Sequence, residues 1–237
     1  MRTKSVIFDL DDTLVAFDLV TDSTWRQVCR EYVEKNDAVS FSLVFDTVTS
    51  ESRDFWSDEE RHRTGRLNIG AARREVVSSA FSKLRLPEAD ALQVADRYSS
   101  LRLENMYVLP GAVETLSSLA RRGIRLALMS NGDSELQRYK LRRFDLEKYF
   151  SEILIEGEVG YGKPDRRIYE LAISRLASSP ESIIMIGDNL KWDVAGPLSA
   201  GMRGIWFDVR SMGLPAGSAI KPYAVVRELA ALEEYID

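Results

Sequence analysis

The sequence predicts an α/β protein with a doubly wound parallel sheet and an inserted all-helical domain. A short apolar run, Val6–Phe8, ends in carboxylates, and from Ile124 onward similar runs alternate with helical patterns. Between them, the pattern from about Leu19 to Met106 is helical, with few strand signals. Strands that alternate with helices form parallel sheets with right-handed crossovers. We therefore expect a core of residues 1–15 and 107–237 and a helical domain of residues 16–106.

The first strand carries the first candidate site. Val6–Phe8 predicts a buried strand because its residues are β-branched or aromatic and show no alternating polarity. Asp9 and Asp11 follow at its carboxyl end, where open α/β sheets bind ligands. Two carboxylates this close repel each other unless a cation or a proton lies between them. On these residues alone, a metal site and an acidic turn in which Asp12 or Thr13 caps a helix are equal alternatives.

The inserted region predicts a bundle of about four helices. Apolar residues recur there at the three-and-four spacing of amphipathic helices. Two such sets are Trp25, Val28, Cys29, Tyr32 and Val33, followed by Phe41, Val44, Phe45 and Val48. Further helices are expected over Ala71–Leu84 and Pro87–Leu103, where Pro87 suits a first helical turn.

Few residues of this region suggest a catalytic, metal-binding or substrate-binding role. The basic segment Arg61–Arg66 favours a solvated helix end, with a loop that receives an anionic substrate as the alternative. His62 is the chain's one histidine, so a His–His metal pair is impossible and a catalytic role is disfavoured. Trp25 and Trp56 favour packing over substrate stacking.

After Val108–Gly111 the pattern returns to alternating helices and strands. In order, we expect helix Ala112–Arg122, strand Ile124–Met129, helix Ser134–Phe144, strand Ser151–Ile155, helix Asp165–Leu176, strand Ser182–Ile186, helix Ala195–Ala200, strand Gly204–Phe207, a short strand Tyr223–Val226 and a closing helix Arg227–Tyr235.

Small polar residues follow two of these strands. Ser130 and Asn131 come after one, and Gly187, Asp188 and Asn189 come after another, with Asp193 five residues beyond Asp188. Gly187 lets the backbone come close to whatever Asp188 holds.

Lys163 lies between the glycine-punctuated loop Glu156–Gly162 and an expected helix N-terminus, where an anion is favoured. The glycine spacing does not match a dinucleotide fingerprint, and the absence of Ser or Thr after the lysine excludes a P-loop. Taken alone, the segment favours a solvated lysine.

Composition narrows the class of protein. The formal net charge of −5 disfavours nucleic acid as a partner. One cysteine, Cys29, excludes an internal disulfide and favours a reducing compartment. No apolar run approaches the roughly 20 residues of a membrane helix, and the first strand leaves no room for a signal sequence. We expect a cytoplasmic protein that does not bind membranes.

Four motifs in this order resemble those of the haloacid dehalogenase-like (HAD) superfamily, over essentially the whole chain. FDLDDTL is similar to its first motif, LMSN to its second, GKPD to its third and IGDNLKWD to its fourth. The resemblance implies a Rossmann-like core. The helical insertion is similar to the cap of the phosphatase branches, which include phosphoglycolate phosphatase, acylneuraminate phosphate phosphatases and nucleotidases.

The resemblance also implies the roles of the site residues. Asp9 would be the nucleophile that forms an aspartyl-phosphate, and Asp11 the general acid and then the base for water. Asp9, the main-chain carbonyl of Asp11 and Asp188 would hold Mg²⁺, a hard cation that oxygen ligands suit. Lys163 would neutralise the transferring phosphoryl group, with Ser130 and the N–H of Asn131 binding its oxygens. Thr13, Asp193 and Asn189 would support the site.

The expected function is a Mg²⁺-dependent phosphatase of small phosphorylated metabolites, acting as a monomer or a homodimer. A phosphomutase or another phosphotransferase would use the same aspartyl-phosphate. A 2-haloacid dehalogenase is disfavoured because those enzymes usually lack the carboxylate corresponding to Asp11. Phosphonate cleavage is disfavoured because Lys35 and Lys83 lie in no recognisable context. A non-catalytic binding module is disfavoured because unpaired carboxylates so close together are costly.

Overall fold

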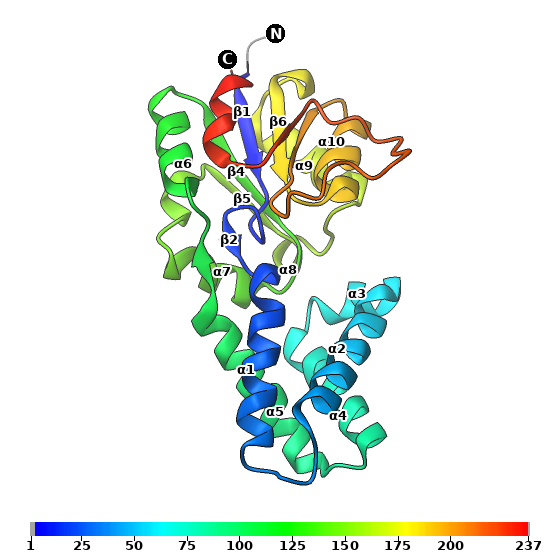
Figure 1. Cartoon of the computed structure of the whole chain (residues 1–237). Helices are drawn as coiled ribbons and strands as arrows, with labels where there is room; N and C mark the ends of the chain where they lie inside the picture. Colours follow the sequence, from blue (N-terminus) through cyan, green and yellow to red (C-terminus); the bar gives the residue numbers. More distant parts are fainter. Residues whose placement is uncertain (1–2, 237) are drawn as a thin grey trace. The chain divides into compact units, whose positions relative to one another are not determined.

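The structure is a computed structural model that describes residues 3–236 (Figure 1). The chain divides into two compact units, Met1–Ala16 with Tyr107–Asp237, and Phe17–Met106. The first unit is called the core unit below and the second the helical unit.

The core unit is built on a six-stranded sheet in the order β5-β4-β1-β6-β7-β8, and each neighbouring pair is parallel. Phe8 at the end of the central strand pairs with Leu128 on one side and Ile186 on the other, so the loops after three strands leave from one edge. The predicted doubly wound sheet is thereby confirmed. The strands are β1 (Ser5–Phe8), β4 (Arg125–Ser130), β5 (Glu152–Ile155), β6 (Ile183–Gly187), β7 (Arg203–Phe207) and β8 (Ala224–Val226).

Helices cover the sheet on both sides, and Figure 1 shows α6 and α9 on opposite sides of it. On α9, Ile168, Ala172 and Leu176 repeat at four-residue spacing and pack into one buried cluster with Ile7 and Met185 of the sheet. The helices of this unit are α6 (Ala112–Arg121), α7 (Ser134–Arg143), α8 (Glu156–Val159), α9 (Arg166–Leu176) and α10 (Gly196–Ser199), with 3₁₀ turns Glu147–Tyr149 and Pro180–Ser182.

Three predicted segments differ from the structure. The closing segment is a 3₁₀ helix, Leu229–Glu234, because the buried Leu229 and Leu232 are three residues apart and suit that tighter repeat. A π-helical turn, Leu190–Ala195, precedes α10, whereas a single α-helix was expected from Ala195. The glycine-rich loop before Lys163 contains the short helix α8.

The helical unit has a buried core of its own, formed by aromatic and aliphatic residues from four of its helices. Its described residues form five α-helices where about four were predicted. They are α1 (Thr21–Val33), α2 (Phe41–Ser57), α3 (Glu59–Gly65), α4 (Ile69–Leu84) and α5 (Glu88–Asn105), after a 3₁₀ turn Asp18–Val20. Pro87 is the residue before α5 and not in its first turn.

A two-stranded ribbon lies where the chain leaves and re-enters the core unit. Strands β2 (Val15–Ala16) and β3 (Tyr107–Val108) are antiparallel, with Ala16 opposite Tyr107. Two residues are too few to show a periodicity, so the sequence did not predict this ribbon. Over residues 3–236, no helix combines the length and the apolar character that a membrane crossing requires.

Candidate active site

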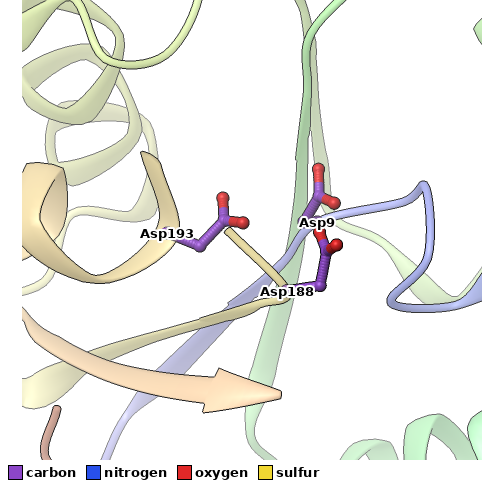
Figure 2. Close-up of side chains that lie close together, drawn as sticks. All are labelled: Asp9, Asp188 and Asp193. Carbon is purple, nitrogen blue, oxygen red and sulfur yellow. The ribbon is translucent and has the colours of Figure 1, made fainter. Parts of the chain in front are cut away.

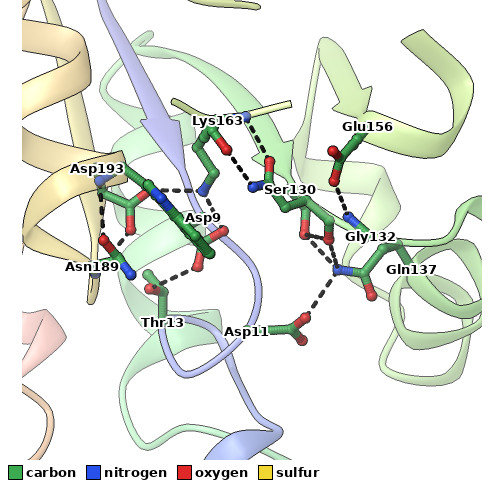
Figure 3. A network of polar contacts seen from close by, with 12 residues as sticks. Asp9, Asp11, Thr13, Ser130, Gly132, Gln137, Glu156, Lys163, Asn189 and Asp193 are labelled. Carbon is green, nitrogen blue, oxygen red and sulfur yellow. Dashed lines mark hydrogen bonds and ion pairs between the residues drawn. The ribbon is translucent and has the colours of Figure 1, made fainter. Parts of the chain in front are cut away.

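Loops at the carboxyl edge of the sheet bring the predicted site residues together (Figure 3). Asp9 and Asp11 follow β1, Ser130 ends β4, and Asp188 follows β6. Lys163 reaches the same place from the segment between α8 and α9.

Lys163 is the buried cation at the centre of this site. Its Nζ donates to Oδ1 of Asp9 at 2.6 Å and to Oδ1 of Asp193 at 2.7 Å, and the side chain is 1% exposed. Burial alone would lower the pKa of the ammonium group, but Asp193 and Asp9 outweigh it and raise the pKa above its usual value. The interpretation of Lys163 as a solvated lysine is therefore wrong.

Three carboxylates crowd beside this lysine. Asp9, Asp188 and Asp193 each place an oxygen within 4.8 Å of the others (Figure 2). Burial raises the pKa of Asp9 to about 7, against the effect of Lys163 and together with Asp193. Burial, then Asp9 and Asp193, raise the pKa of Asp188 to about 9. Carboxylates that resist ionisation in this way favour a bound cation, and an all-oxygen donor set fits a hard divalent ion.

The charged side chains around the site also favour a bound cation. Arg210 donates to Asp12 at 2.6 Å and to Asp188 at 3.4 Å, while Lys140 and Lys163 pair with the other acids. Among the described residues these three cations pair with five carboxylates, and a divalent cation bound there would offset the remaining negative charge. The five carboxylates are Asp9, Asp11, Asp12, Asp188 and Asp193.

Asp11 points toward helix α7. Lys140, which is fully buried, donates to its two carboxylate oxygens at 2.6 and 2.8 Å, and Gln137 donates to Oδ2 at 3.0 Å. The Gln137 amide also lies 2.5 Å from Ser130 Oγ, to which it donates. Sequence analysis missed both α7 residues, because polar side chains at three-residue spacing look like the exposed face of a helix.

Asn131 holds the backbone of Lys163. Its Nδ2 donates to the Lys163 carbonyl at 2.7 Å, and its Oδ1 accepts from the Lys163 N–H at 2.7 Å. A Cβ on Gly162 would lie 2.5 Å from that Oδ1, so glycine permits this approach. The Asn131 side chain thus positions Lys163, a contact that the sequence did not reveal.

The remaining predicted residues lie around the carboxylates. Thr13 Oγ1 donates to Asp9 Oδ2 at 3.4 Å. The Asn189 N–H donates to Asp193 Oδ2 at 3.0 Å, and the Asn189 side chain accepts from the N–H groups of Lys191 and Trp192 in the π-helical turn. Asp12 does not cap a helix, because it takes a left-handed conformation (φ 57°) in the turn after Asp9 and is buried against Arg210. Arg210 has no motif context and was missed.

The helical unit holds the other residues that sequence analysis weighed. Arg61–Arg66 spans the end of α3, and Arg61, Arg63 and Thr64 are exposed, as expected of a solvated helix end, while Gly65 is buried. His62 lies there with its ring 5.6 Å from that of Trp56. Trp25 is 2% exposed and stacks on Tyr98, which agrees with a packing role.

A doubly wound sheet whose strand ends carry clustered carboxylates and a buried lysine defines a class of α/β hydrolases with an inserted domain. Residues 3–201 match the family model of haloacid dehalogenase-like hydrolases, and the chain belongs to that family.

Two curated relatives and one solved structure are similar to the chain. The N-acylneuraminate-9-phosphatase of Rattus norvegicus is 33% identical over 257 residues, which cover 100% of this chain and 96% of that protein. The phosphoserine phosphatase of Thermus thermophilus is 46% identical over 99 residues, which span 42% of this chain and only 40% of that protein. The magnesium-bound HAD-hydrolase YfnB of Bacillus subtilis has a TM-score of 0.75 at 24% identity, with 100% of both chains covered. This chain is accordingly a phosphoric monoester hydrolase.

Proposed function

We propose that this protein is a Mg²⁺-dependent phosphatase of small phosphorylated metabolites that works through an aspartyl-phosphate on Asp9. The cluster of Asp9, Asp188 and Asp193 around buried Lys163 supports this proposal most directly. The phosphatase named among the relatives over the full chain and the magnesium named for YfnB add support.

The donor set fits Mg²⁺, which favours one or two carboxylates and several waters. Asp9, the main-chain carbonyl of Asp11 and Asp188 would hold the ion. Asp193 has both oxygens engaged, one by Lys163 and the other by the N–H of Asn189, so we assign it a supporting role. When bound, Mg²⁺ would neutralise the phosphate and let a carboxylate approach it.

The two oxygens of Asp9 have different surroundings. Oδ1 accepts the 2.6 Å hydrogen bond from Lys163, whereas Oδ2 has a long contact of 3.4 Å with Thr13. Oδ2 is therefore the less constrained oxygen, and we assign it the attack on phosphorus. Lys163 would neutralise the charge that spreads over the transferring group, and Ser130 with the N–H of Asn131 would bind its oxygens.

Asp11 would protonate the leaving alcohol and then accept a proton from the water that hydrolyses the aspartyl-phosphate. Lys140 and Gln137 fix the position of its carboxylate. This second carboxylate favours phosphoester over carbon–halogen chemistry. We further propose that the helical unit is a cap that selects the substrate, and that the enzyme works in the cytoplasm.

The direct test is turnover of p-nitrophenyl phosphate with Mg²⁺ and with EDTA. We expect hydrolysis that needs the metal and is abolished in Asp9→Asn, while Asp145→Asn, an exposed carboxylate paired with Lys148, keeps full activity. Full activity of Asp9→Asn, or no metal-dependent turnover of any phosphoester, would refute the proposal. Transfer of the phosphoryl group to a second hydroxyl of a sugar phosphate would instead identify a phosphomutase.

A further inference from the structure

Gln137 of α7 places one amide nitrogen among three oxygens of the site. The side chain is 1% exposed. Its Nε2 lies 2.5 Å from Ser130 Oγ, 2.9 Å from the Asn131 carbonyl oxygen and 3.0 Å from Asp11 Oδ2. Figure 3 shows this side chain pointing toward Asp11 and Ser130. An amide nitrogen only donates, so all three oxygens accept in these contacts.

The neighbours of the amide fix its orientation. If Oε1 and Nε2 of Gln137 were exchanged, Oε1 would face the ionised carboxylate of Asp11 and the carbonyl of Asn131, which have no hydrogen to donate. In the orientation observed, Oε1 is buried and accepts no hydrogen bond from residues 3–236. A buried carbonyl without a donor is costly. Such a cost is expected of a side chain that serves function rather than stability.

The contact with Gln137 also directs the hydrogen of the Ser130 hydroxyl. Because Oγ accepts from Gln137, the hydroxyl hydrogen points elsewhere. Within the described chain it reaches the Asn131 carbonyl at 3.4 Å, beyond the usual range of about 2.5–3.0 Å for a hydroxyl donor. That carbonyl already accepts from Gln137 at 2.9 Å. The hydrogen of Ser130 therefore stays available for an oxygen of a bound ligand.

Asp11 depends less on Gln137 than Ser130 does. Lys140, which is fully buried, donates to both oxygens of the Asp11 carboxylate, at 2.6 and 2.8 Å. Gln137 reaches only Oδ2, at 3.0 Å. Hydrogen bonds between two charged groups are stronger than those from a neutral amide. Loss of the amide should therefore leave Asp11 in place and act on Ser130.

We propose that Gln137 is a positioning residue that turns the hydrogen of the Ser130 hydroxyl toward the phosphoryl group. The inference rests on the proposed phosphatase function, in which Ser130 binds a phosphoryl oxygen. Without Gln137, the hydroxyl hydrogen would turn to the Asn131 carbonyl, which has lost its own donor. Ser130 Oγ would then present lone pairs to a negatively charged oxygen. Gln137 thus acts on the phosphoryl group through Ser130.

The kinetic test is a double-mutant cycle with p-nitrophenyl phosphate and Mg²⁺. We expect kcat/KM to fall by about tenfold to a hundredfold in Gln137→Met and in Ser130→Ala, the effect of one hydrogen bond to a charged group. Both changes remove the same hydrogen bond, so Gln137→Met should have less than about a threefold effect in the Ser130→Ala background. Gln27→Met, which changes an exposed glutamine paired with Glu31, should keep full activity. Equal losses in both backgrounds, or no loss in Gln137→Met alone, would overturn the inference.

Binding of inorganic phosphate in the presence of Mg²⁺, measured by isothermal titration calorimetry, repeats the cycle without turnover. A wild type that binds phosphate but hydrolyses no ester would refute the proposed function alone. We expect each single variant to raise the Kd for phosphate by about tenfold to a hundredfold, with less than about a threefold further rise in the double variant. An unchanged Kd in Gln137→Met, additive losses, or a wild type that binds no phosphate would overturn the inference.

The urea midpoint separates a positioning role from a structural one. Gln137→Met removes the buried Oε1 that has no donor among the described residues, so the midpoint should not fall. Gln137→Leu provides a second uncharged variant for the same cycle if Gln137→Met does not fold. Failure of both variants to fold would show that Gln137 is structural and would overturn the inference.

Discussion

Lys163 stabilises the site because its one positive charge pairs with two buried carboxylates. Its ammonium lies between Asp9 and Asp193 at 1% exposure, where neither carboxylate is well solvated. Breaking a buried pair leaves an uncompensated charge, which costs more than the pair itself contributes.

Replacement of this lysine therefore has a defined expected cost. Lys163→Met should lower the free energy of unfolding by about 3 kcal/mol or more at pH 8 and abolish activity. The loss should shrink at pH 6, where Asp9, whose pKa is already raised to about 7, can take up a proton. Urea unfolding at both pH values measures this. Lys148→Met, which removes an exposed lysine paired with Asp145, should leave the free energy of unfolding almost unchanged, and a similar cost in the two variants would contradict the account.

The raised pKa of Asp188 also makes the free energy of unfolding depend on pH. The carboxyl group of Asp188 has an ordinary pKa of about 3.9 in the unfolded chain and a raised pKa of about 9 in the folded chain. Between these two pH values the folded chain therefore keeps a proton that the unfolded chain has lost. The free energy of unfolding of the metal-free protein should therefore fall as pH rises between these values.

In the proposed site Mg²⁺ would bind the ionised carboxylates, so its stabilising effect should grow over the same pH interval. We expect the rise in Tm on adding Mg²⁺ to be larger at pH 9 than at pH 6, and to be strongly reduced in Asp188→Asn. Differential scanning calorimetry measures both. A rise in Tm that stays constant or declines toward pH 9 would show that these carboxylates do not bind the ion.

At the level of elements, the end of β6 and the turn that follows it fit together closely. A Cβ on Gly187 would lie 2.3 Å from Cγ of Asp193, a buried side chain. Gly187→Ala must therefore displace Asp193 from Lys163, and we expect at least a tenfold loss of kcat. The control is Gly70→Ala on α4, where a Cβ meets nothing within 4 Å and helix propensity favours alanine. Equal kinetics of the two variants would show that the position of Asp193 does not matter.

The sequence predicted the six strands of the sheet because buried parallel strands are continuous apolar runs. It also predicted α6, α7 and α9 between them, but not α8 or the π-helical turn. It placed Asp9, Lys163 and Asp188 at strand or loop ends, since the motifs adjoin those runs. Residues held only by tertiary contacts could not be found this way. Arg210 lies in a loop without pattern, and Gln137 and Lys140 turn polar side chains of α7 inward.

At the scale of the whole molecule, the two chain segments that connect the units pair with each other as the antiparallel strands β2 and β3. Ala16 and Tyr107 are opposite each other in an antiparallel pair, so a short turn can link them. We predict that replacing residues 17–106 by a short Asn-Gly turn leaves a folded core unit that binds Mg²⁺ and hydrolyses p-nitrophenyl phosphate.

Circular dichroism and Mg²⁺ titration of this shortened chain test its folding. A shortened chain that folds but binds no Mg²⁺ would mean that the carboxylates of the core unit do not suffice for the metal.

The phosphorylated state of Asp9 tests the central claim most directly. The protein is mixed with substrate and Mg²⁺, quenched in acid during turnover, digested and examined by mass spectrometry. We predict that the peptide containing Asp9 gains the mass of one phosphoryl group, and that the gain is absent without Mg²⁺ and in Asp9→Asn. Turnover with no phosphorylated peptide, or with the phosphoryl group on another residue, would contradict the account.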